Sequence, residues 1–251
     1  MHVRSRAGAG APVLFLHQTA SSGAMWEKVM ARWTAPHRLY AFDTPGFGGS
    51  FDPASPTSME DYARWIGEAA DALGLEQYHL VGHHTGSGIA LAMADAHPGR
   101  VLSVALIGVS CLSPEERDTF AAKLGAPFRP VRSGAYLLKN WEYLRVGGAD
   151  ADVALLHREM VDQLRAWATR PDAYAAAWAQ DNAASIARLT CPAIAAAAPD
   201  DLLHPSLARV AELRPDLRCV TLSGGANFEP DLVPDELATL LLDHIAQAEA
   251  S

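Results

Sequence analysis

One short stretch, residues 78–90, constrains the fold of this chain more than any other. A largely apolar run leads into a turn flanked by Gly82 and Gly86, and a helix of small residues follows at once. This pattern is typical of a tight strand–turn–helix elbow, which presents one side chain above the end of a buried strand. Glycine is needed on both sides because strand and helix approach too closely there for a Cβ atom. The residue that this elbow presents is His84.

Short apolar runs alternate with helical patterns on both sides of the elbow, which predicts a mostly parallel central sheet flanked by helices, an α/β fold. The other predicted buried strands are 12–17, 38–43, 101–107, 191–198 and 217–222. From about Cys111 to Ser185 the chain shows helical periodicity with aromatic residues and no strand-like run. We therefore predict a core made of residues 1–110 and 186–251, with a helical cap of residues 111–185 inserted between them.

Composition narrows the possible partners and the location. The net charge of −9, without clusters of Lys and Arg, argues against nucleic acid or an anionic membrane as a partner. The three cysteines are scattered, which suits a reducing compartment better than a disulfide framework. No apolar segment has the form of a signal peptide or the length of a membrane span. These features predict a cytoplasmic protein, and they leave open whether it is a monomer or a homodimer.

Four landmarks in order resemble the α/β-hydrolase superfamily, and the resemblance covers nearly all of the chain outside the predicted cap. They are the oxyanion-loop segment 15–18, the Asp-x-Pro-Gly turn at 43–50, the elbow at 82–86, and the acid and histidine segments at 191–201 and 224–230. The resemblance implies that fold and an enzyme without a cofactor. A single landmark of this kind is weak, but four in the family's order specify the fold strongly.

The resemblance also assigns the three catalytic positions, and two of them depart from the family pattern. The acid maps to Asp201, with Asp200 as the near alternative, and residues 108–110, after the preceding strand, offer no carboxylate in its place. The nucleophile position holds His84, and the position of the general-base histidine holds Asn227. A Ser-His-Asp mechanism is therefore excluded at these positions.

The two departures are chemically consistent with each other. A serine hydroxyl needs a base, whereas a neutral imidazole already carries a free lone pair, so His84 removes the need for the histidine that Asn227 replaces. We expect the Asn227 amide to accept a hydrogen bond from one imidazole nitrogen and fix its tautomer. Asp201 then either holds Asn227 or favours the protonated form of the imidazole.

An oxyanion hole needs only backbone N–H groups, and the resemblance implies those of Gln18 and Thr85, with His17 supporting the loop. Three roles for His84 remain open: general base for water, which we rank first, base in a lyase or isomerase reaction, and nucleophile. We predict hydrolysis of an ester, a thioester or a C–C bond in a small apolar carbonyl compound. The alternatives are a lyase or isomerase, or a ligand-binding protein without catalysis.

A metal site is the remaining possibility for the polar residues of this region. His17, His84, His204 and Asp201 are of ligand type, yet they come from separate loops and lack metal-type spacing. We therefore predict no metal. The sequence leaves the substrate open.

Overall fold

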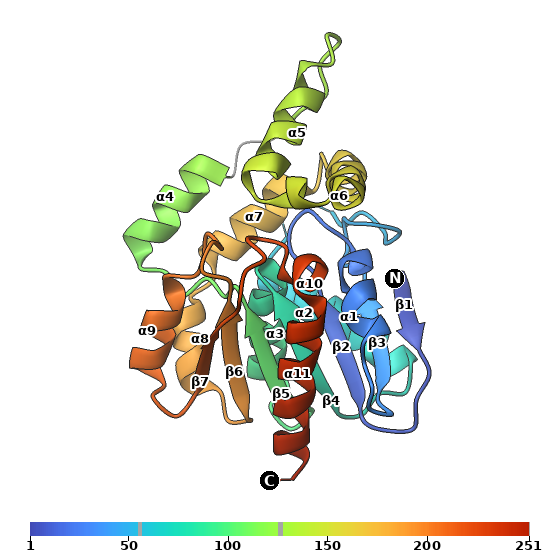
Figure 1. Ribbon diagram of the computed structural model, residues 1–251, viewed down its shortest axis with the longest axis vertical. Helices are drawn as coiled ribbons and strands as arrows, with labels where there is room; N and C mark the ends of the chain where they lie inside the picture. The colour runs from blue at the N-terminus through green and yellow to red at the C-terminus, as the bar shows by residue number, and fades with distance from the viewer. Residues whose placement is uncertain (55–56, 125–127, 251) are drawn as a thin grey trace.

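A seven-stranded sheet forms the centre of the computed structural model, which describes residues 1–54, 57–124 and 128–250 (Figure 1). The order across the sheet is β1-β3-β2-β4-β5-β6-β7. The strands are β1 (Val3–Arg6), β2 (Pro12–Leu16), β3 (Arg38–Phe42), β4 (Tyr78–His83), β5 (Val101–Ile107), β6 (Ala193–Ala197) and β7 (Arg218–Thr221).

The sheet is mostly parallel, which confirms the predicted fold class. Strands β2 to β7 pair in parallel, and each coincides with a predicted apolar run. Among the strands of the described residues, only β1 pairs antiparallel, at the β3 edge, and the sequence analysis did not predict it. Its residues Val3–Arg6 are polar at most positions and only partly buried, so they lack the apolar pattern of a central strand.

Helices cover both faces of the sheet and extend beyond one end of it. They are α1 (Glu27–Ala31), α2 (Met59–Ala72), α3 (Thr85–Ala96), α4 (Pro114–Leu124), α5 (Ala135–Val146), α6 (Val153–Arg165), α7 (Arg170–Ala179), α8 (Asn182–Arg188), α9 (Ser206–Leu213), α10 (Glu229–Leu232) and α11 (Pro234–Glu249), with 3-10 turns η1 (Gly23–Trp26) and η2 (Ala149–Ala151).

Two hydrophobic cores lie on opposite faces of the sheet. One lies under α2, α3, α8 and α9, and includes Leu14, Ile89 and Val210. The other lies under α1 and α11, and includes Trp26 and Leu241. Burying both faces explains why the central strands are continuous apolar runs rather than alternating ones.

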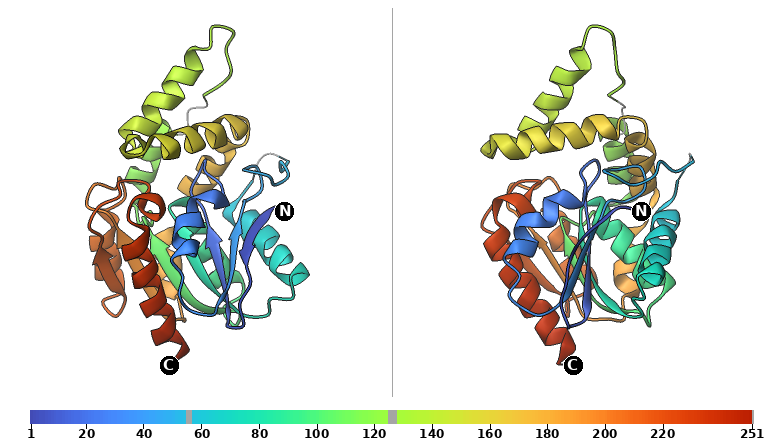
Figure 2. Two further views of the ribbon diagram at one scale, coloured as in Figure 1. Left: turned by 45° about the vertical axis from the view of Figure 1, so that its right-hand side comes forward. Right: turned by 90° about the vertical axis from the view of Figure 1, so that its right-hand side faces the viewer.

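Helices α4 to α7 lie beyond the carboxyl ends of the strands, above the sheet in Figure 1 and in both views of Figure 2. Helices α5 and α6 share a small core of their own with Phe228 of the last loop. The predicted cap, 111–185, ends inside α8, and α8 packs against α3 and α9 beside the sheet. We call α4 to α7 the inserted helices.

Helix α2 begins with a reciprocal pair of hydrogen bonds. The Ser58 hydroxyl accepts one from the Asp61 backbone N–H, and the Asp61 carboxylate accepts one from the Ser58 backbone N–H. This reciprocal pair is a capping box, worth about 1 kcal/mol. Within the described residues, every helix is too short or too polar to cross a lipid bilayer.

Candidate active site

His84 sits at the apex of the turn between β4 and α3, as the elbow pattern predicts. Its backbone has φ 49° and ψ −111°, an uncommon conformation for a residue with a Cβ. A Cβ on Gly82 would collide with the Gly86 carbonyl, and one on Gly86 would collide with the Leu16 carbonyl. The close approach inferred from the two glycines is therefore present. It holds the His84 side chain above the end of the sheet.

The imidazole of His84 is bonded directly to Asp201. Its Nε2 lies 2.9 Å from Asp201 Oδ2, and the Asp201 side chain is fully buried while that of His84 is 14% exposed. Gly108, just after β5, makes room for this contact, because a Cβ there would collide with the His84 ring. The second carboxylate oxygen of Asp201 accepts from the Leu203 backbone N–H at 2.6 Å.

The charge of Asp201 follows from these contacts. Burial alone would raise its pKa, but the charge and hydrogen bond of His84 and the Leu203 N–H act in the opposite direction and hold the pKa of Asp201 below its usual range. Asp201 is therefore an ionised acceptor. An ionised carboxylate places the imidazole proton on His84 Nε2, which leaves the lone pair of a neutral ring on Nδ1.

His17 holds the loop after β2 rather than contacting His84. Its Nδ1–H donates to the Gln18 carbonyl at 2.7 Å, and its Nε2 accepts from the Thr44 backbone N–H at 3.0 Å. Burial lowers the pKa of His17, so the ring is neutral and serves both bonds. This arrangement fits the supporting role expected for it.

The two expected oxyanion residues, Gln18 and Thr85, line the same cavity as His84. Thr85 is the first residue of α3, and N–H groups in the first turn of a helix have no acceptor within that helix. The Gln18 side chain donates to the Asn227 carbonyl at 3.0 Å, which ties the loop after β2 to the loop after β7.

Asn227 does not make the hydrogen bond that the sequence analysis expected. Its side-chain oxygen accepts from the Leu202 backbone N–H at 3.1 Å, while Asp201 occupies the imidazole nitrogen. The turn after β6 explains this, because it brings Asp201 itself to His84. Asp200 faces the other loop instead and accepts from the Ala226 backbone N–H at 3.0 Å. Asn227 and Asp200 thus fasten the two loops together beside the cavity.

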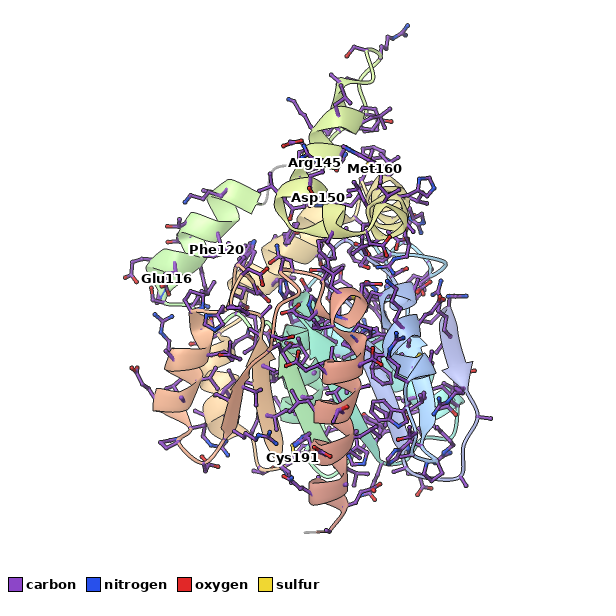
Figure 3. All side chains as sticks on the ribbon, viewed as in Figure 1. Glu116, Phe120, Arg145, Asp150, Met160 and Cys191 are labelled. Atoms are coloured by element: carbon purple, nitrogen blue, oxygen red, sulfur yellow. The ribbon has the colours of Figure 1, made fainter. Side chains whose placement is uncertain are left out.

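A cavity of about 390 Å³ opens over His84. The core loops and α3 form its floor, and α5, α6 and α7 form its ceiling. Three ceiling residues are aromatic: Tyr143, Tyr174 and Trp178. Phe120 of α4 packs against Trp178 with ring centroids 5.2 Å apart, and Figure 3 shows Phe120 on that helix above the sheet. The size and lining suit a small, largely apolar ligand.

A second buried pair lies behind the first, and sequence reasoning missed it. His83 Nε2 lies 2.7 Å from Glu229 Oε2, and both side chains are fully buried. Burial, followed by the charge of Asp201, raises the pKa of Glu229 well above its usual range, and burial lowers the pKa of His83. Burial therefore favours the neutral form of both groups. The two histidine rings stack with centroids 4.3 Å apart.

These residues also form a candidate metal cluster among the described residues, because His83, His84 and Glu229 present ligand atoms within 4.8 Å of one another. The ring planes of the two histidines differ by only 4°. A nitrogen lone pair lies in its ring plane, so two parallel stacked rings cannot both point at one ion. The arrangement fits hydrogen-bonded pairs better than a metal centre. His204 lies apart, with Nε2 3.2 Å from the Thr221 hydroxyl.

Comparison with known proteins identifies the fold. The family model described as "alpha/beta hydrolase fold" matches residues 11–126. A relative named "Putative carbamate hydrolase RutD", from Azorhizobium caulinodans, is 27% identical over 94% of this chain and 91% of its own. A fluoroacetate dehalogenase from a Burkholderia species is 26% identical over 97% of this chain and 90% of its own.

A solved thermophilic esterase from Thermogutta terrifontis superposes with a TM-score of 0.77 at 18% identity, over 98% of this chain and 93% of that one. At 18% identity the similarity supports the fold alone. The chain has the α/β-hydrolase fold.

Proposed function

We propose that the protein is a hydrolase for small, largely apolar carbonyl compounds, with His84 as the general base. The observation that carries the proposal is the contact of His84 Nε2 with the buried Asp201 carboxylate beneath the cavity. The similar proteins are named as a hydrolase, a dehalogenase and an esterase, which supports hydrolysis in general. The carbonyl class, whether ester, thioester or activated C–C bond, belongs to the proposal.

In this mechanism Nδ1 of His84 takes a proton from water, and the hydroxide formed attacks the carbonyl carbon. The carbonyl π electrons move to oxygen, where the backbone N–H groups of Gln18 and Thr85 stabilise the negative charge. The tetrahedral intermediate then collapses, the bond to the leaving group breaks, and the imidazolium returns its proton to the leaving group. Asp201 stabilises the imidazolium throughout.

The remaining site residues position this machinery. His17 orients the loop that carries Gln18, and Asn227 holds the loop that carries Asp201. The inserted helices act as a cap that keeps bulk water from the carbonyl. No step uses a metal or an organic cofactor.

The experiment compares wild-type, His84→Ala and His204→Ala proteins on a panel of activated aryl esters and thioesters, with intact-mass analysis of quenched samples. Loss of about 10²–10⁴-fold in kcat with His84→Ala alone is the expected result for a general base. His204 is the matched control, since it is a loop histidine outside the cavity lining.

Other results would assign His84 a different role. A trapped acyl adduct on His84 would make it the nucleophile, through an acyl-imidazole. Equal rates in all three proteins would overturn hydrolysis by His84 on these substrates. Two alternatives to hydrolysis would then remain. His84 would take a proton from the substrate in a lyase or isomerase reaction, or the protein would only bind its ligand.

A further inference from the structure

The ceiling of the cavity carries an ionisable group that the proposed reaction does not use. Glu159 lies on α6, its side chain is 2% exposed, and it lines the same cavity as His84. Helix α6 lies above the carboxyl ends of the strands (Figure 2), and His84 lies in the turn between β4 and α3. A ligand in the cavity is therefore placed between the imidazole and this carboxyl.

The contacts of Glu159 within the protein are one-sided. The Ser21 hydroxyl donates to Oε1 at 2.8 Å, and Arg158 Nη2 donates to the same oxygen at 2.6 Å. Both bonds engage Oε1, so Oε2 is the atom that can meet a ligand. Arg158 also bonds both oxygens of Asp231 at 2.7 Å, so its charge is divided between two carboxyl groups.

The cavity favours some ligand charges over others. Its described lining includes the acidic side chains of Glu159 and Asp200, and no Lys or Arg. A ligand carboxylate would therefore meet like charge without a cation to pair with it. A hydroxyl or an ammonium group would meet a carboxyl acceptor. A polar group that is buried in a complex costs free energy unless it is hydrogen-bonded. A donor on the ligand therefore contributes most to binding free energy when it bonds Glu159.

We propose that Glu159 is a substrate-recognition residue, which accepts a hydrogen bond from a hydroxyl or ammonium group of the substrate while the substrate carbonyl lies at His84. The assignment deepens the proposed function, on which it rests for the position of the carbonyl. Burial raises the pKa of Glu159 to about 7, against the charge of Arg158, and a donor on Oε2 stabilises the ionised carboxyl.

The test measures binding rather than turnover, by calorimetry at neutral pH. Its probes are unreactive anilides of straight-chain acids of equal length, whose far ends carry a methyl, hydroxyl, ammonium or carboxylate group. Wild-type protein is expected to bind the hydroxyl or the ammonium probe at least roughly tenfold more tightly than the methyl probe, and the carboxylate probe most weakly. The tighter of the two donor probes identifies the kind of donor.

Two variants and one control locate the effect. Glu159→Met removes the acceptor at similar length, and Glu159→Gln keeps the shape but not the charge. Glu159→Met should reduce the preference for either donor to less than about twofold, and Glu159→Gln should abolish any preference for the ammonium probe. Asp162→Asn is the control. Asp162 accepts a hydrogen bond from Ser22, the neighbour of the Ser21 that bonds Glu159, but Asp162 does not line the cavity.

Three results would overturn the assignment: equal binding of all probes to wild-type protein, a donor preference that survives Glu159→Met, or one that Asp162→Asn removes equally. The last result would assign the preference to loop position instead of direct contact. The anilides measure binding without turnover. A donor preference that depends on Glu159 would therefore remain valid even if the protein were inactive on the ester panel. Failure of the proposed function and failure of the Glu159 assignment are thus distinguishable.

Discussion

The floor and the ceiling of the cavity each hold a buried carboxyl group, and their pKa values move in opposite directions. On the floor, the pKa of Asp201 is lowered despite burial, because His84 and the Leu203 N–H stabilise the anion. On the ceiling, burial prevails and raises the pKa of Glu159 to about 7 although Arg158 lies 2.6 Å away. The difference follows from the contacts: donors reach both oxygens of Asp201, whereas those of Glu159 reach one oxygen only and Arg158 is shared with Asp231.

The two regions also differ in how they are held. His84 follows β4 and Asp201 lies in the turn after β6, and both strands pair with β5, so strand register and backbone hydrogen bonds fix the chain on this side. Glu159 stands on a helix whose core with α5 is small, and it reaches the loop after β2 through Ser21. We therefore expect substitutions on the floor to change mainly the reaction rate. Substitutions on the ceiling should change mainly how stability varies with pH and which ligands bind.

The largest effect is expected from Asp201→Asn. The amide preserves shape but removes the charge that stabilises the imidazolium, so kcat should fall on the order of 10²-fold in the ester assay. Asp200→Asn is the matched comparison, because Asp200 bonds the Ala226 N–H and not His84. A greater loss in Asp200→Asn would transfer the acid role to Asp200.

The second prediction concerns the space that Gly108 leaves for the His84 ring. Gly108→Ala adds a Cβ that collides with the imidazole, at a position with φ +55°, and should destabilise the protein by about 2–3 kcal/mol as well as lower kcat. Denaturant unfolding measures the first and the ester assay the second. Gly224→Ala is the control, since a Cβ there meets no atom within 4 Å. Equal stability of the two variants would contradict the contact.

Glu159, on the ceiling, should contribute to the pH dependence of stability. The folded-state pKa of Glu159, about 7, lies above its ordinary 4.5, so its contribution is full below pH 4.5 and is lost as pH rises through about 7. The shift corresponds to about 3 kcal/mol. Glu159→Gln should remove that part of the decline in unfolding free energy between pH 4.5 and about pH 7. Glu142→Gln, at an exposed site on α5, should not.

The smallest effect is expected from Asn227→Ala. It deletes one hydrogen bond to the Leu202 N–H, which should cost about 1 kcal/mol of unfolding free energy and lower kcat less than Asp201→Asn does. Parallel melting curves and initial rates measure both. If Asn227→Ala instead matched Asp201→Asn in rate, direct contact of the amide with the reacting groups would be required.

Local chemistry explains what was predictable from sequence. The glycine spacing at 82 and 86 reports a backbone contact between neighbouring elements, and Ser58 with Asp61 reports a capping box. The apolar runs report strands buried on both faces. Each signal lies within a few residues of the structure that it specifies. For that reason the fold class, the elbow and the residues around it followed from the sequence, whereas the polar edge strand β1 did not.

The sequence by itself determined the parallel strands of the sheet, the elbow and the histidine that it presents. Only the tertiary structure decided which acid reaches His84, over a separation of 117 residues, and that Glu229 pairs with His83 over 146. It also turned Asn227 to Leu202 and placed Glu159 over the cavity. The physical reason is that these contacts depend on how separate loops and helices pack, and a side chain's own sequence neighbours carry no record of that.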